Sequence, residues 1–310
     1  MRSSNVNTTT AAINSRAVPA QHKATRVAVK TLRRIALYAV LTGFAGFFLF
    51  PLVVMVFASF KDMDAILHSS ILGVPLNPTL QPWRDAWSSA CIGTSCVGLR
   101  GYYLNTILIV VPSVLVSALI GAINGFALSK FRFYGANLVY GLILFGTFAP
   151  YQVMLVPISK MLGMLGLSNG IGGLILLHTV YGLPMTTMFF RNYFMTVPQD
   201  LIKAARVDGA GFWTTFFLII LPMATPMIVV TVIWQFTSIW NDFLFGVSFT
   251  SGANTPIMVA LNNLVSSAGG ERPYNIHMAG ALLSALPTLV VYLLAGKYFV
   301  RGLMAGAVKG

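Results

Sequence analysis

Six long apolar segments, separated by polar connections, constrain the fold of this chain more than any other feature of its sequence. A helix rises 1.5 Å per residue, so about 20 apolar residues cross the roughly 30 Å hydrocarbon core of a bilayer. Each segment reaches that length, which predicts an all-α, polytopic membrane protein with six transmembrane helices. The segments are 35–60, 103–128, 138–162, 171–190, 216–245 and 278–300.

The composition supports a lipid environment over a soluble one. Of the 310 residues, 56% are hydrophobic and only 9% are charged, whereas soluble domains carry about 25% charged residues. The net charge of +13 would point to nucleic acid in a soluble chain. No basic stripe interleaved with aromatic residues is present to bind nucleic acid, so we interpret the charge as a signal of membrane topology and expect no nucleic-acid partner.

The basic residues predict the orientation in the cell membrane. If the N-terminus is cytoplasmic, all but five of the 20 Lys and Arg residues face the cytoplasm, as the positive-inside rule requires. Both termini and the connection 196–216 are then cytoplasmic. The five on the outer side are Lys61, Arg84, Arg100, Lys160 and Arg272.

The N-terminal segment 1–34 is polar and basic and contains no acid. This composition predicts a disordered cytoplasmic tail. Two interpretations are open: a solvated tail, or one that touches anionic lipid headgroups, at about 1 kcal/mol per charge near the surface.

The connection 196–216 carries signals for a short helix between the fourth and fifth apolar segments. Thr196 and Gln199 fit a capping box, and Pro198 is tolerated in a first helical turn. Gly209 supplies a left-handed stop. Helical spacing places two small residues between a leucine and an acid on one face that a partner can approach closely: Leu201, Ala204, Ala205 and Asp208.

Within this connection, K-A-A-R-V-D-G-A-G at 203–211 resembles the E-A-A-x-x-x-G loop of the membrane subunits of binding-protein-dependent ABC importers. Lys203 stands where the family has Glu, which puts any salt bridge of that Glu in doubt here. Three further stretches are similar to the carbohydrate, maltose-transporter-type branch: F-A-P-Y-Q-V-M-L-V-P (148–157), I-W-N-D-F-L-F (239–245) and Y-F-V-R-G-L-M-A-G-A-V-K-G (298–310). Together the resemblance covers residues 36–310.

The resemblance implies a type-1 ABC importer transmembrane domain of six helices over 35–310, with the family core at about 102–298. It also implies a cytoplasmic coupling helix that relays the motion of a separate ATPase. The implied partners are a homologous second permease subunit, two ATPase subunits and an extracytoplasmic sugar-binding protein. The implied ATPase contacts are Leu201, Lys203, Ala204, Ala205, Arg206, Asp208, Gly209, Ala210 and Gly211.

The similarity of residues 274–310 to glucose- and mannose-type systems favours a monosaccharide as the solute. A disaccharide and glycerol phosphate are alternatives. An ion-coupled secondary carrier is a further alternative from a different class. Such a carrier would need intramembrane acids and commonly a repeated half, and the apolar segments contain one Asp and no repeat.

Catalytic and cofactor motifs are absent from the sequence. Gly296-Lys297 is followed by Tyr298 and lacks the upstream Gly of a phosphate-binding loop. ATP and Mg²⁺ are therefore expected on the partner ATPase and no cofactor on this chain. The four histidines have no metal-ligand spacing, so no metal site is predicted, and we expect a transport subunit that is not itself an enzyme.

Polar residues in the apolar segments are candidates for the translocation path. Asp242 would be costly facing lipid, so it either faces a water-filled path or satisfies backbone groups near the end of its helix. We predict that Gln152, Asn241 and Asp242 face the path, with Pro150 and Pro157 favouring unwinding around Gln152. Other polar candidates, which could instead join helices, are Asn105, Asn124, Gln235 and Trp240; His178 is interpreted as a satisfied core or pore residue.

The only two cysteines lie in the first outer connection, in C-I-G-T-S-C. On the outer side, where oxidation can occur, Cys91 and Cys96 either close a small disulfide loop or remain free thiols.

Overall fold

The computed structural model describes residues 20–68, 70, 72–131, 133–148, 150–266 and 272–307. Side chains are described within 29–296. The helices are α1 (Ala20–Ser59), α2 (Met63–His68), α3 (Gln81–Ser88), α4 (Arg100–Lys130), α5 (Ala136–Phe148), α6 (Tyr151–Met164), α7 (Ile171–Thr196), α8 (Gln199–Val207), α9 (Phe212–Thr214), the π-helix η1 (Thr215–Ile220), α10 (Leu221–Met223), α11 (Thr225–Trp240), α12 (Leu244–Phe249), the 3₁₀ turn η2 (Gly252–Asn254), α13 (Ile257–Ser266) and α14 (Tyr274–Ala307).

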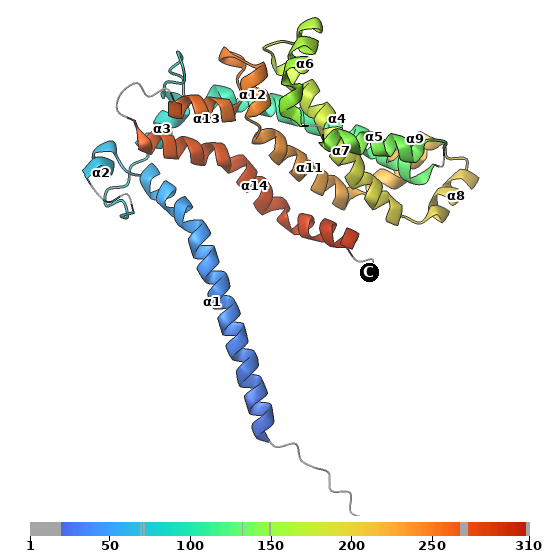
Figure 1. Ribbon diagram of the computed structural model, residues 1–310, viewed down its shortest axis with the longest axis horizontal. Helices are drawn as coiled ribbons and strands as arrows, with labels where there is room; N and C mark the ends of the chain where they lie inside the picture. The colour runs from blue at the N-terminus through green and yellow to red at the C-terminus, as the bar shows by residue number, and fades with distance from the viewer. Residues whose placement is uncertain are drawn as a thin grey trace, which may run out of the picture. The chain divides into compact units, whose positions relative to one another are not determined.

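The chain divides into two units, Met1–Val54 and Met55–Gly310. In the first unit the described residues form one helix, the greater part of α1 (Figure 1). Residues 20–34, predicted as part of a disordered tail, are the first turns of this helix, so that prediction is wrong for them. Residues 1–19 of the predicted tail lie outside the described residues.

Four of the six predicted spans are single helices long and apolar enough to cross a membrane: Val29–Ser59, Arg100–Lys130, Ile171–Thr196 and Tyr274–Gly296. The other two are bent helix pairs, so the described residues reach the predicted six spans when each pair is counted as one span. Pro150 precedes the first residue of α6, and Pro226 lies in the first turn of α11, beyond a 79° bend. A proline there lacks the N–H that would continue the preceding helix.

Within the second unit, α4 and α7 lie side by side and form the centre of the bundle (Figure 1). Glycines permit the close approach. A Cβ on Gly121 would lie 2.3 Å from Thr186 Oγ1, and one on Gly125 would lie 2.6 Å from the backbone nitrogen of Arg191. The two helices run in the same direction, because Ser113 meets Ile175 and Gly125 meets Phe190 further along both. The bent pair α5–α6 therefore returns the chain across the bundle.

Two apolar clusters occupy opposite ends of this helix pair. One joins the first half of α4 to α6, α7 and α11–α13, with Trp240 and Phe245 among its members. The other, which we call the aromatic cluster, joins the last turns of α4 and α7 to α8, η1 and α11. Its buried members are Ala122, Phe126, Phe190, Phe194, Val197, Ile202, Phe216, Ile220, Ala224, Met227 and Val230.

The connections that we expect on the outer side are more ordered than their turn-rich sequences indicate. The sequence 250–277 is rich in turn residues, yet it contains the helix α13. Cys91 and Cys96 form a disulfide, the first of the two interpretations, and Ile92 inside this loop is buried. Trp240 donates a hydrogen bond to the carbonyl of Ser284 at 2.9 Å, which ties α11 to α14.

Candidate functional site

The short helix α8 begins differently from the sequence prediction. Helix α7 continues to Thr196, whose hydroxyl donates to the Tyr193 carbonyl at 2.7 Å within its own helix. The predicted capping box is therefore wrong, because Thr196 still belongs to the preceding helix. Gln199 instead donates its side-chain amide to the Lys130 carbonyl at 3.2 Å.

The end of α8 confirms the predicted glycine stop. Gly209 has φ of 82°, and its N–H donates to the Arg206 carbonyl at 3.0 Å. The N–H of Ala210 donates to the Ala205 carbonyl at 2.8 Å. This pair of bonds caps the last carbonyls of the helix and requires a left-handed residue at Gly209.

Opposite faces of α8 have different environments. Ile202 is buried in the aromatic cluster, and Ala205, three residues later on the same stripe, is also buried. The prediction that Ala205 faces a partner is therefore wrong. Leu201 and Ala210 are half-buried. The exposed residues, which we call the outer face of the α8 loop, are Lys203, Ala204, Arg206, Val207, Asp208, Gly209 and Gly211.

The charges on this loop are partly satisfied within the chain. Lys203 donates to Asp200 at 2.8 Å between two exposed side chains. This bond and the charge of the lysine lower the pKa of Asp200. The guanidinium of Arg206 lies 5.1 Å from the centre of the Phe131 ring. A lysine at 203 thus has an acid one turn earlier in its own helix.

The base of α8 is fixed to α4 by two hydrogen bonds that sequence reasoning missed. Lys130, only 7% exposed, donates its ammonium to the Val197 carbonyl at 2.5 Å. Gln199 returns a bond to the Lys130 carbonyl. In the sequence, Lys130 was interpreted only as a marker of topology, and nothing local indicates that it reaches a residue 67 positions later.

A second feature is a cavity of about 470 Å³ between the start of α6, the middle of α7 and the end of α11. Asn241 and Asp242 line it, but Gln152 does not: Gln152 is exposed on α6, while its neighbour Tyr151 lines the cavity. Unwinding around Gln152 is limited to the break before Tyr151, since Pro157 lies inside α6. The lining residues are Tyr151, His178, Tyr181, Gly182, Trp234, Gln235, Ser238, Ile239, Asn241, Asp242, Phe243, Leu244 and Phe245.

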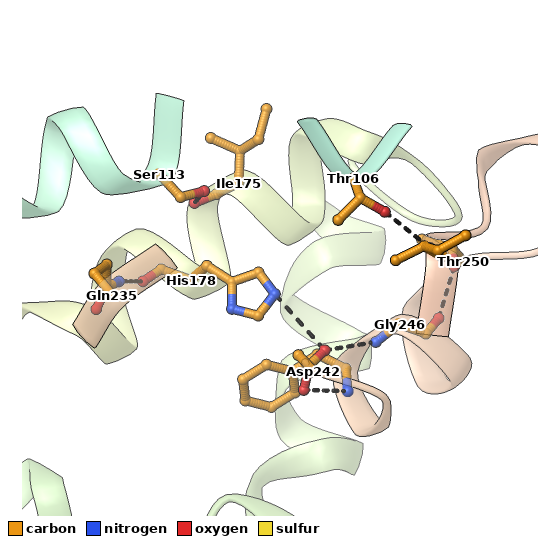
Figure 2. Close-up of polar contacts among 10 residues, drawn as sticks. Thr106, Ser113, Ile175, His178, Gln235, Asp242, Gly246 and Thr250 are labelled. Carbon is orange, nitrogen blue, oxygen red and sulfur yellow. Dashed lines mark hydrogen bonds and ion pairs between the residues drawn. The ribbon is translucent and has the colours of Figure 1, made fainter. Parts of the chain in front are cut away.

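Asp242 follows α11 and precedes α12, and its carboxylate accepts two backbone bonds there. One oxygen accepts the N–H of Phe245 at 3.3 Å and the other that of Gly246 at 3.1 Å. The second oxygen also lies 3.7 Å from His178 Nε2 (Figure 2). The interpretation that Asp242 satisfies backbone groups is therefore confirmed. Asp242 also lines the cavity, and a water-filled path there stays a prediction.

Gln235 reaches the same cavity from α11 and is only 2% exposed. Its amide nitrogen donates to the backbone carbonyl of His178 at 3.1 Å (Figure 2), and its amide oxygen has no hydrogen-bond partner among the described residues. Gly182 makes room for this side chain, because a Cβ there would lie 2.1 Å from Gln235 Nε2. A buried, unpaired acceptor is suited to a donor from a bound molecule or water.

The other polar candidates join helices and loops, and none of them lines the cavity. Asn105 donates to the carbonyls of Ala253 and Thr255, and Asn124 donates to Thr187. The sequence reasoning missed Tyr181, Gly182 and Ser238, which line the cavity at helical spacing from two residues that it did name, His178 on α7 and Gln235 on α11. That spacing is the signal that could have found them.

Residues 113–303 match the model of the binding-protein-dependent transport system inner membrane component. The chain belongs to this family. It is thus a multi-pass membrane component of a transport system, and the type-1 importer fold inferred from the resemblance is confirmed.

Individual relatives agree with the family. A probable ABC transporter permease protein of Pyrococcus horikoshii is 47% identical over 188 residues, 60% of this chain and 68% of the relative. The xylose/arabinose import permease protein XacI of Haloferax volcanii is 29% identical and covers 89% of this chain and 94% of its own length. A crystal structure of a bacterial ABC transporter involved in import of the acidic polysaccharide alginate superposes with a TM-score of 0.75 at 20% identity, over 87% of this chain and 98% of that one.

Proposed function

We propose that this chain is the permease subunit of an ATP-driven sugar importer, in which α8 docks on a separate ATPase and relays its motion to the bundle. The complete importer would contain a homologous second permease subunit, two ATPase subunits that bind ATP and Mg²⁺, and an extracytoplasmic sugar-binding protein. Both termini and α8 would face the cytoplasm, in keeping with the distribution of Lys and Arg.

The observation that carries this proposal is the two-sided environment of α8. Its inner face is anchored in the aromatic cluster, while Val207 on the outer face is 87% exposed. Edge-on and tilted ring contacts connect Phe126 of α4 to Phe194 of α7, Phe212 of α9 and Phe216 of η1. A force on the outer face would therefore move the ends of several helices together, since packed cores transmit displacement.

The second element of the proposal is the path. The cavity would form this subunit's part of it, with aromatic faces from Tyr181 and Trp234 and polar groups from Gln235, Asn241 and Asp242. Sugars need this combination, because their ring faces stack on aromatic side chains and their hydroxyls need donors and acceptors.

The relatives support a sugar as the solute class without selecting one sugar. One relative is named as a xylose/arabinose import permease, so the relatives do not favour glucose or mannose. Transport of either of these sugars stays a prediction from residues 274–310. Family membership is further evidence against the ion-coupled carrier.

The test is ATP-dependent sugar uptake by the complete importer in proteoliposomes, with Val207→Asp compared with Val207→Ala. A charge in the middle of the docking face should abolish uptake and release the ATPase from the membrane subunits, whereas alanine should reduce uptake only slightly. Wild-type uptake and ATPase retention in Val207→Asp would refute docking through α8.

A further inference from the structure

The residues that line the cavity include one carboxylic acid and no lysine or arginine. Asp242 supplies the acid. The other titratable side chains that line the cavity are those of His178, Tyr151 and Tyr181. The charged side chains of the loop around α8 and of the outer connections do not line the cavity.

We propose that Asp242 makes this cavity selective by charge, so that it admits neutral sugars and rejects anionic ones such as sugar phosphates and uronates. The proposal rests on the proposed function, since it requires the cavity to lie on the path. It makes Asp242 a specificity-determining residue and argues against glycerol phosphate as the solute.

The position of the carboxylate supports this role. Its two backbone bonds, from Phe245 and from Gly246, hold both oxygens in place; Figure 2 shows the bond from Gly246. Each carboxylate oxygen has a second lone pair, so the group can still accept hydroxyl donors of a neutral sugar. An anionic solute brings no donor at its charged group and is repelled, and a low local dielectric strengthens that repulsion.

Gln235 provides an independent indication that a hydrogen-bond donor enters here. Its amide oxygen is unpaired among the described residues, and the orientation of the amide is fixed by the His178 carbonyl. A neutral sugar hydroxyl can donate to this oxygen, whereas a phosphate dianion or a carboxylate offers it only another acceptor. Both polar groups thus favour solutes of the same chemistry.

Ser238 allows the charge selectivity to be measured without knowing the sugar. It lines the cavity and is exposed, and both native cysteines are joined in the disulfide. A Ser238→Cys variant of the complete importer would be treated with a cationic and with an anionic methanethiosulfonate reagent. Each rate is divided by the rate with a free thiol in solution, so that the ratio reports only the local potential.

The normalised rate should be about tenfold or more higher for the cationic reagent, because the Asp242 carboxylate lines the same cavity and acts at an intermediate dielectric. Asp242→Asn in the same background should remove most of this preference, and Asp242→Glu should keep it. Asp64→Asn is the matched control: it removes one charge from an exposed acid of α2, and the preference should persist.

Two other results would overturn the proposal. Equal rates for both reagents, or a preference that survives Asp242→Asn, would refute charge selection while leaving ATP-driven uptake and the proposed function intact. A Ser238→Cys importer that transports sugar with ATP but reacts with neither reagent in any nucleotide state would show that solutes do not enter this cavity.

Discussion

The substitution Lys130→Met tests whether the base of α8 must be fixed to α4 for transport to be coupled to ATP hydrolysis. Methionine keeps the length and apolar stem of the side chain but removes the ammonium that donates to Val197. A hydrogen bond to a charged group contributes about 1.5–3 kcal/mol, and a buried carbonyl left unpaired costs about 1–3 kcal/mol. Loss of the buried charge itself offsets part of this, so we expect a net cost of about 1–3 kcal/mol.

A cost of that size would raise the population in which the base of α8 is detached by roughly 5- to 150-fold. If α8 relays the motion of the ATPase, more ATP will then be hydrolysed for each sugar taken up. The assay measures both quantities in proteoliposomes that contain the complete importer, together with its melting temperature.

The controls separate the bond from a general effect of losing a lysine. Lys130→Arg keeps a charged donor and should restore much of the coupling. Lys160→Met removes an exposed lysine of α6 and should change neither the ATP-to-sugar ratio nor the melting temperature. If Lys130→Met matches the wild type in both measurements, the bond from Lys130 to Val197 does not contribute to coupling.

Three further predictions follow from single contacts. Gly182→Ala should displace the Gln235 amide from the His178 carbonyl, lower sugar uptake and destabilise the complex by about 1–3 kcal/mol. Gly146→Ala is the control and should be close to neutral, because its Cβ would lie 3.7 Å from its nearest neighbour, Pro184. Equal uptake by both variants would contradict the packing argument. Gly209→Ala should destabilise the end of α8 by about 1 kcal/mol because residue 209 has a positive φ. Faster proteolysis at the loop would detect this change. Gly211→Ala should not change the proteolysis rate, because Gly211 has φ of −74° and open space around it. Replacing both Cys91 and Cys96 by serine should lower the free energy of unfolding by about 2 kcal/mol, the closure entropy of so short a loop. The variant should melt at a lower temperature, and reduction of the wild type should give the same decrease. A melting temperature insensitive to reduction would count against a stabilising disulfide.

Much of the helix order could be predicted from apolar segment length alone, because a lipid-facing backbone must satisfy its own hydrogen bonds. The positions at which helices break could not be predicted in this way. Pro112, Pro157, Pro184 and Pro287 lie inside helices, whereas Pro150 and Pro226 mark breaks. A proline in a bundle is compatible with both outcomes, since neighbouring helices can satisfy the carbonyl groups that it frees.

The candidate site was also predictable from the sequence only in part. Asn241 and Asp242 were predictable, because polar side chains in an apolar segment need a polar environment. Gln152 was misplaced, because its direction depends on where α6 begins. The bond between Gln235 and the His178 backbone joins residues 57 positions apart, and the bond between Lys130 and Val197 depends on the packing of α4 against α7. Neither contact has a local sequence pattern.

The most direct test of the account is sugar uptake by purified complete importer in sealed proteoliposomes, with either enclosed ATP or an imposed proton or sodium gradient as the energy source. The account predicts accumulation with ATP and Mg²⁺, none with a non-hydrolysable ATP analogue, and none with either gradient alone. Accumulation driven by an ion gradient in the absence of nucleotide would contradict it.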